Sequence, residues 1–422
     1  APRKAFPDAY RSIMRAKAAH YDRPRYGDKT PFHASYIGTI LKDFPGARII
    51  HILRDPRPTC LSLRDMPWAP GSWILNNRYM ARLAKEVLDL DQFDPTDVAT
   101  ESLRETALAL EDAARSVPGV TNSNGASASA GTSSLVLATS HGFRGHRFRS
   151  GFSRSASVVA GEGTAMQRDY DFDSRMHYAD LKPAEVIGRE AGERAVKRLN
   201  PGTLATGRMP IVLDPRIARG LLASLVSAIN GAAIARGTSF LKGRMGEKVL
   251  PEEMTVTDEP TLMRRPGSRP FDGEGVAGKP LTLVEAGILK HWLLDTATAR
   301  ELGLATNGRA SRSGAGLSPG ATNVVLTPGR LSPQELIAET GSGFYVNETI
   351  GHGTNLVTGD YSCGASGFLI ENGELTRPIS EVTIAGNLTE MLLALSAADD
   401  LDTRFSIVAP TLRIGAMTVA GR

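Results

Sequence analysis

The chain has little cysteine and no long apolar run. Its two cysteines, Cys60 and Cys363, lie far apart among 422 residues and form no C-x-x-C pair. A disulfide framework and a structural zinc ribbon are therefore not expected, and a reducing cytoplasm is the simplest compartment. No window of about eighteen apolar residues occurs, so we expect no membrane span. The N-terminus lacks the apolar core of a secretory signal, and the missing initiator methionine indicates a processed or truncated start.

Excess positive charge is confined to the first part of the chain. Residues 1–87 hold 16 Lys and Arg against 7 Asp and Glu, a balance of +9. The remainder holds 33 against 38, a balance of −5, which leaves +4 overall. Such asymmetry is typical of segments with different origins or partners. The small total and the lack of a basic stripe interleaved with aromatic residues give no reason to expect a nucleic-acid partner.

Hydrophobic periodicity predicts a mixture of helices and strands, and the length predicts two or three domains. The apolar run 48–53 predicts a buried strand that opens through a polar turn into a helix, which is an α/β unit. Small polar residues alternate with apolar ones over 117–172, which predicts a β-meander, although 123–134 also fits a flexible linker. The other predicted elements are a strand at 209–213 and helices at 100–115, 183–199, 214–235, 332–340 and 388–397.

Two of these helices carry further signals. The helix at 214–235 has Asp214 as its expected N-cap and Pro215 in its first position. Its apolar residues fall on one helical face and are Ile217, Leu221, Leu222, Leu225, Val226 and Ile229. In the helix at 183–199, two i,i+4 ion pairs are expected, namely Glu190 with Arg194 and Glu193 with Lys197.

The run 341–387 is dense in glycine, and such density needs a local reason because glycine loses more conformational freedom on folding than any other residue. Sharp turns, close backbone approach or a bound ligand would each explain it. His352, Asp360 and Cys363 could contact a metal, or could serve only as turn and core residues. Ser366 could be a nucleophile, or could lie in a turn leading into a hairpin over 368–374, where Asn372-Gly373 favours a type I′ turn.

Several spaced motifs, in order along residues 88–422, resemble the TldD/PmbA family and in particular its PmbA (TldE) branch. They cover 117–123 with 125–129, 140–143 leading to 153–157, 237–240, 351–362, 364–368 with 370–373, and 410–414. The resemblance spans roughly four-fifths of the chain. It implies an α+β fold with β-rich domains and flanking helices, divided here into a central domain at 88–200 and a C-terminal domain at 201–422.

The resemblance also implies a cytoplasmic two-subunit metallopeptidase. The TldD partner supplies the zinc site, from an H-E-x-x-x-H helix and a cysteine near its C-terminus, and the PmbA partner helps to enclose an unfolded peptide. The family's first domain would precede residue 88, and most of it is missing here. As peptide or interface contacts we predict Gly351, His352, Gly353, Asn355, Asp360, Tyr361, Gly364 and Ser366.

The catalytic ligands of the TldD branch are absent from the comparable positions. The window 223–230 reads ASLVSAIN, no histidine lies between His177 and His291, and no glutamate lies between Glu193 and Glu247. The tail 399–422 has no cysteine. We therefore expect no catalytic residue, no metal and no cofactor in this chain, with zinc held by a TldD-type partner.

Residues 21–85 resemble a fragment of a sulfotransferase. Gly27-Asp-Lys-Thr-Pro31 matches a K-T-P element, and the strand 48–53 with Arg54 and Ser62 matches the site for the 3′-phosphate of the sulfate donor. An arginine at a strand end and a hydroxyl at a helix N-terminus would both meet a phosphate. The resemblance implies that the glycine-rich loop for the 5′-phosphate lies upstream, before the chain begins, and no G-x-x-x-x-G-K-[ST] loop occurs elsewhere to replace it. The segment 1–87 is thus an incomplete α/β fragment. It could bind the sulfate donor, could be the remnant of such a domain, or could result from a non-functional fusion.

Overall fold

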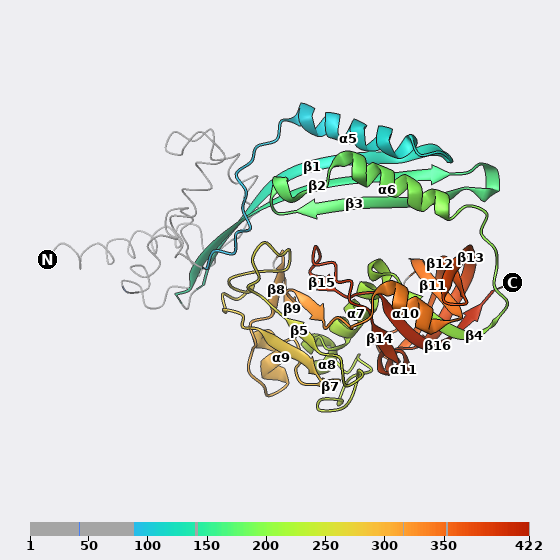
Figure 1. The fold of residues 1–422 in the computed structure, drawn as a ribbon. Helices are drawn as coiled ribbons and strands as arrows, with labels where there is room; N and C mark the ends of the chain where they lie inside the picture. The colour runs from blue at the N-terminus through green and yellow to red at the C-terminus, as the bar shows by residue number, and fades with distance from the viewer. Residues whose placement is uncertain (1–41, 43–87, 140–141, 315, 352, 422) are drawn as a thin grey trace, which may run out of the picture. The chain divides into compact units, whose positions relative to one another are not determined.

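The computed structural model describes residues 42, 88–139, 142–314, 316–351 and 353–421 (Figure 1). The predicted strand and helix of 21–85, with Arg54 and Ser62, lie outside the described residues, as does His352. The described residues of Val87–Ser133 and Phe148–Arg422 belong to one compact unit. Within the described part, no helix combines the length and apolar character needed to cross a membrane.

The central domain is a three-stranded antiparallel sheet covered on one face by two helices (Figure 1). Its core consists of small and aliphatic side chains, among them Leu110, Ala156, Val158 and Ile187. The predicted β-meander is confirmed, and the linker interpretation of 123–134 is wrong because those residues belong to the first strand. The elements are α5 (Thr100–Arg115), β1 (Val120–Ala138), β2 (Arg144–Ala160), β3 (Gln167–Arg175) and α6 (Ala184–Lys197).

Two glycines let α5 and α6 lie unusually close together. A Cβ atom on Gly188 would lie 2.3 Å from the carbonyl oxygen of Leu110, and one on Gly192 would lie 2.8 Å from that of Ala114. Both distances are far below van der Waals contact, so only glycine fits at these positions without a shift of the backbone. The pair therefore determines how tightly the two helices pack on the sheet.

The C-terminal domain contains a six-stranded sheet in the order β13-β12-β11-β4-β16-β14, and a further pairing of β13 with β16 closes five of these strands into a ring. The strands are β4 (Gly207–Leu213), β11 (Gly343–Ile350), β12 (Asp360–Glu371), β13 (Glu374–Asn387), β14 (Leu395–Ala397) and β16 (Leu412–Ala420). A five-stranded sheet follows the order β15-β10-β5-β6-β7, and β8 pairs with β9. These strands are β5 (Val256–Asp258), β6 (Leu281–Glu285), β7 (Ile288–Leu289), β8 (Ala310–Ser313), β9 (Gly316–Pro319), β10 (Val324–Leu326) and β15 (Ile407–Val408).

The helices of this domain are α7 (Pro215–Ala228), α8 (Gly231–Ala235), α9 (Thr296–Glu301), α10 (Pro333–Thr340) and α11 (Leu388–Leu393). The predicted start of α7 is confirmed, since the Asp214 side chain accepts a hydrogen bond from the Arg216 N–H and Pro215 occupies the first position. Its apolar face packs into one large core with Ile211 and Phe344. Helix α7 is thus held against the ring by side chains on a single face.

Three predicted helix features are wrong. The helix expected over 214–235 is broken, because the Asn230 side chain accepts from the Ala232 N–H and starts α8. The helix expected to end at 397 ends at Leu393, and β14 follows. Glu190 pairs with Lys182 at 3.1 Å rather than with its i+4 neighbour Arg194, which pairs with Asp171 instead. Each of the two side chains therefore has its ion-pair partner outside α6.

The glycine run 341–387 folds as β11, β12 and β13 with their connections, and its glycines have structural reasons. A Cβ atom on Gly367 would lie 1.8 Å from the carbonyl oxygen of Tyr345 on the neighbouring strand. The predicted hairpin turn is confirmed, since Asn372 and Gly373 have φ of 52° and 79°, the signature of type I′. Close approach and turn geometry therefore explain part of the glycine density without a ligand.

We predict that Gly188→Ala destabilises the chain, although alanine is normally preferred to glycine in a helix by about 1 kcal/mol. The added methyl would meet the Leu110 carbonyl, and overpacking of this kind costs about 1–3 kcal/mol. Gly220→Ala is the matched control on α7, where a Cβ atom meets nothing within 4 Å. Thermal denaturation should give a lower melting temperature for the first variant and an equal or higher one for the second. Equal effects would contradict the close-packing argument.

Candidate functional site

A row of three aspartates on β3 organises the site. Asp169, Asp171 and Asp173 alternate along the strand and therefore share one side of it, and their side chains are buried. Helix α6 lies over this side and supplies two guanidinium groups. Arg194 lies 2.7 Å from Asp171, and Arg198 lies 3.4 Å from Asp169. The row is thus partly neutralised from within the central domain.

The same aspartates reach arginines of the C-terminal domain. Arg216, near the start of α7, lies 3.2 Å from Asp169, and Arg404 lies 3.2 Å from Asp173. Arg404 also binds Asp402 through two nitrogens, at 2.8 Å from Nε and 2.5 Å from Nη2. Two arginines are therefore held in place between the domains by carboxylates on either side.

The aspartates respond differently to this environment. Burial acts to raise the pKa of Asp173, but hydrogen bonds from the Lys182 N–H and from Arg175 and Arg404 outweigh it and hold that pKa below its ordinary value. Burial raises the pKa of Asp171, and its ion pair offsets this only in part. Asp173 is therefore the residue of the row whose negative charge the fold favours most clearly.

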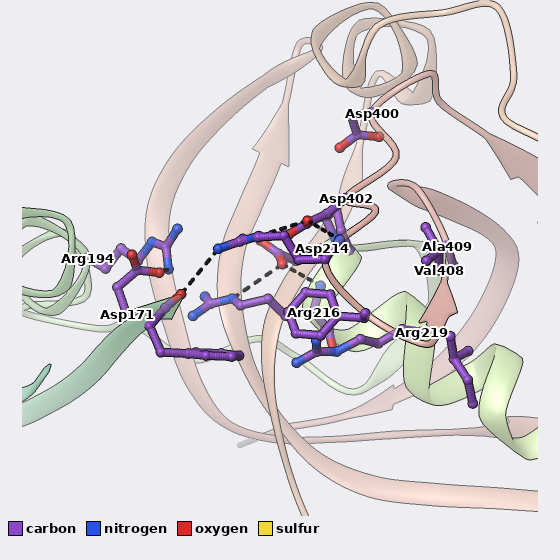
Figure 2. A pocket seen from close by; sticks show the side chains of 14 residues that line it. Asp171, Arg194, Asp214, Arg216, Arg219, Asp400, Asp402, Val408 and Ala409 are labelled. Carbon is purple, nitrogen blue, oxygen red and sulfur yellow. Dashed lines mark hydrogen bonds and ion pairs between the residues drawn. The ribbon is translucent and has the colours of Figure 1, made fainter. Parts of the chain in front are cut away.

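Two pockets that share several lining residues lie where these groups meet, and Figure 2 shows the smaller of them. The smaller has a volume of about 280 Å³ and is lined by Asp171, Phe172, Arg194, Asp214, Pro215, Arg216, Arg219, Asp400, Asp402, Arg404, Phe405, Ile407, Val408 and Ala409. The larger, here called the arginine pocket, has a volume of about 480 Å³ and is lined by Phe172, Ser174, Arg216, Arg219, Gly220, Ala223, Pro266, Arg404, Phe405, Ser406 and Ile407. Three arginines line both.

Arg219 differs from the other two arginines. Among the described residues, no carboxylate lies within ion-pair distance of it, and its Nε donates to the Arg216 carbonyl at 3.2 Å. Its guanidinium carbon lies 3.8 Å from the centroid of the Phe405 ring, a cation–π contact that orients the group. Burial lowers the pKa of Arg219, and the nearby Tyr170 and Asp402 offset this only in part. The pocket can therefore hold an anion.

The predicted contact residues lie elsewhere, half of them on the loop 351–359 between β11 and β12 and half on β12 itself. The Asn355 side chain accepts from the Val357 N–H at 3.0 Å, and Asp360 accepts from the Thr358 hydroxyl at 2.6 Å. A Cβ atom on Gly353 would lie 2.7 Å from the Ser362 carbonyl oxygen, whereas Gly351, with φ of 94°, lies in open space. The loop is thus shaped by its own hydrogen bonds.

The remaining predicted residues belong to β12. Ser366 is buried and pairs with Glu348 of β11, so it lies inside a strand and the turn interpretation is wrong. Gly364 is half-buried, opposite Ile350. Cys363 is buried, its Sγ lies 3.2 Å from the Tyr361 hydroxyl, and burial raises the pKa of its thiol, which disfavours a reactive thiolate. Burial likewise raises the pKa of Tyr361.

The loop and α7, which are far apart in the sequence, meet in the structure. The Ser224 and Thr354 hydroxyl oxygens lie 3.2 Å apart, and the Phe240 N–H donates to the Leu356 carbonyl at 2.8 Å. Ala223, the neighbour of Ser224, lines the arginine pocket. The glycine loop and the pocket therefore approach the same turn of α7.

Sequence reasoning did not identify the arginine pocket. Arg216 and Arg219 are spaced by three on the otherwise apolar α7, which places both on its polar face. That spacing was an available signal for a paired basic site. The contribution of Arg404 and Phe405 carried no such signal, because they lie almost two hundred residues away in the sequence.

Comparison with known proteins identifies the class. Residues 93–199 match the PmbA/TldA metallopeptidase central domain, and residues 206–421 match the C-terminal domain of the same family. Residues 3–94 match a sulfotransferase family. The chain belongs to the PmbA/TldA metallopeptidase family, and the resemblance inferred from its motifs is confirmed.

Particular relatives support the assignment. The chain is 35% identical to Metalloprotease PmbA of Escherichia coli O157:H7 over 342 residues, which is 81% of this chain and 74% of that protein. It is 34% identical to a PmbA homolog of Haemophilus influenzae over 80% of this chain and 74% of the relative. A crystal structure from Bacteroides thetaiotaomicron has a TM-score of 0.74 at 30% identity and covers 80% of this chain and 76% of its own. TldE of Thermococcus kodakarensis shares the fold, with a TM-score of 0.69 at 23% identity, over 80% and 78% of the two chains. The predicted α+β fold is confirmed.

The zinc that the family name implies does not fit the residues of α7 in this chain. The window 223–230 presents the methyl groups of Ala223 and Ala228, and Ala228 is fully buried. The Ser224 hydroxyl is used by Thr354 and by the Gly220 carbonyl. Over the described part of the chain, no three His, Cys, Asp or Glu side chains are grouped to hold a metal ion. We therefore derive no metal-dependent step for this chain.

We predict that Asp173→Asn destabilises the chain by about 3 kcal/mol at neutral pH, since it removes one partner of buried ion pairs. Because the folded-state pKa lies below the ordinary value of 3.8, the ionised carboxyl stabilises the fold above that pH, and this contribution is lost as the pH falls through the folded-state value. Denaturation at pH 7 and pH 3 should show the difference from wild type shrinking in acid. Asp112→Asn, at an exposed site on α5, is the control and should have little effect at either pH. A pH-independent difference would contradict the argument.

Proposed function

We propose that this chain is a non-catalytic, TldE-like subunit that works with a TldD-type zinc peptidase subunit on unfolded peptides in the cytoplasm. The observation that carries the proposal is the combination of family membership with an α7 window of alanine and serine where catalysis would need zinc ligands and a base. The zinc and the peptidase chemistry would then belong to the partner subunit.

Exposed apolar residues around the glycine loop support a subunit contact there. Ile350, just before the loop that reaches Ser224 on α7, is 63% exposed, and Val357, within the loop, is 57% exposed. Large apolar side chains are costly to leave in water, and a partner surface would cover them. The predicted residues Gly351 and Asn355 of the loop, and Asp360 at the start of β12, would lie at this contact.

We predict that the purified chain holds no stoichiometric zinc and hydrolyses no unfolded peptide alone, whereas a co-expressed TldD-type subunit co-purifies with it and the pair is active. Metal analysis, size-exclusion chromatography and a peptide-cleavage assay measure the three properties. Val357→Asp should weaken the association at least about tenfold, because it places a charge in an apolar contact. Leu304→Asp, at a residue 51% exposed on another surface, is the matched control. Tightly bound zinc with activity of the chain alone would sink the proposal.

The sulfotransferase match of residues 3–94 favours a second candidate function, in which the N-terminal segment binds a 3′-phosphoadenosine sulfate donor. Arg54 and Ser62 would bind the 3′-phosphate. We predict measurable binding of adenosine 3′,5′-bisphosphate by calorimetry if this segment is functional, and its loss in Arg54→Ala because a charge-assisted contact is removed. Arg300→Ala, on α9, is the control. No binding to the wild-type chain would leave the segment as a remnant or a non-functional fusion.

A further inference from the structure

The arginine pocket contains more positive charge than its own lining neutralises. Three arginines line it, together with two phenylalanines and two serines, and no aspartate, glutamate or lysine belongs to its described lining. Placing charged groups in a partly buried site is costly unless each finds a counter-charge. The lining therefore raises the question of which arginine lacks one.

Pairing across the domains answers that question. Arg216 is matched by Asp169 and Asp214, and Arg404 by Asp173 and Asp402. Arg219 has no ion pair among the described residues, and burial lowers its pKa although Tyr170 and Asp402 act in the opposite direction. Within the described part of the chain, Arg219 is thus the arginine of this pocket that is held without a paired carboxylate.

The position of Arg219 is fixed although its charge is unpaired. Its stacking on Phe405 and the hydrogen bond from Nε to a backbone carbonyl hold the planar group against one wall. The terminal nitrogens of such a guanidinium form a rigid fork that matches the two oxygens of a carboxylate. A Cβ atom on Gly220, in the same lining, would meet nothing within 4 Å, so the pocket is open beside Arg219.

We propose that the arginine pocket binds a carboxylate of an extended peptide, with Arg219 as the residue that contacts it. One arginine without an ion pair among the described residues, close to the carboxylate of Asp402, matches a singly charged carboxylate better than a doubly charged phosphate. The rings of Phe172 and Phe405 in the lining would pack against the aliphatic carbons of the peptide next to its carboxylate. This proposal rests on the proposed function for the view that the ligand is a peptide, while the carboxylate preference follows from the pocket alone.

The position along α7 gives the site a role. Gly220 and Ala223 line the pocket, and the next residue, Ser224, contacts Thr354 of the glycine loop. A peptide whose carboxylate is bound at Arg219 would therefore lie beside the window 223–230. The pocket would favour peptides with an acidic group at one place and would set their register relative to α7.

The test compares peptides that differ only in one charge, by calorimetry on the full chain and on its complex with a partner if one forms. One pair is acetyl-tetraalanine with a free or an amidated C-terminus, and the other is acetyl-Ala-Ala-Glu-Ala-amide against its glutamine counterpart. We expect at least one carboxylate peptide to bind about tenfold more tightly than its neutral match, which corresponds to about 1.4 kcal/mol. The pair that discriminates tells whether a C-terminus or an acidic side chain is recognised.

Variants locate the effect. Arg219→Gln should remove the discrimination and Arg219→Lys should reduce it, because lysine keeps the charge but loses the planar fork. Arg300→Gln, at an exposed helical arginine on α9, should leave it unchanged. Inorganic phosphate, as a competing probe, should displace the carboxylate peptides only weakly.

Several outcomes would overturn the proposal. Equal binding within both wild-type pairs would do so without any variant, as would discrimination that survives in a folded Arg219→Gln protein. Tight phosphate binding with no carboxylate preference would assign the pocket to a different ligand. Failure to associate with a TldD-type subunit would count against the proposed function only, because the charge discrimination is measured on the chain itself.

Discussion

The row of aspartates on β3 is the constraint on which the site depends. Three carboxylates on one side of an edge strand cannot be buried together without counter-charges, since each unpaired charge in the interior costs several kcal/mol. Arg194 of α6, Arg198 just after it and Arg175 of β3 supply part of the compensation. Arg216 and Arg404 supply more from the C-terminal domain, so the need to neutralise β3 positions two of the three arginines of the pocket.

This arrangement leaves Arg219 as the exception, and it changes the interpretation of α7. Its apolar face serves the core and its polar face carries arginines. In the non-catalytic role proposed above, a few exposed side chains of this helix would supply anion recognition without any change to the buried face that holds the helix in place.

Much of the fold was predictable because it depends on local patterns. The Ala/Ser alternation of β1 has the period of two that a half-buried strand requires, and Asp214-Pro215 marked the start of α7 through capping and a fixed φ. Asn372-Gly373 specified its turn because both positions need positive φ. The break at Asn230 was not predicted, because the apolar face continues across it and conceals the capping signal of Asn230. The ion pair of Glu190 was not predicted either, because its partner Lys182 lies before the helix and outside the i,i+4 spacing.

The sequence by itself determined the family, the order of strands and helices in the central domain, and the absence of zinc ligands from the window 223–230. Only the tertiary structure decided which charges meet. Asp169 is 47 residues from Arg216 in the sequence, and Asp173 is 231 residues from Arg404. No periodicity of the sequence links positions so far apart. Electrostatic pairing acts through space at a few ångströms, so an arginine without an ion pair among the described residues becomes visible only in the folded chain.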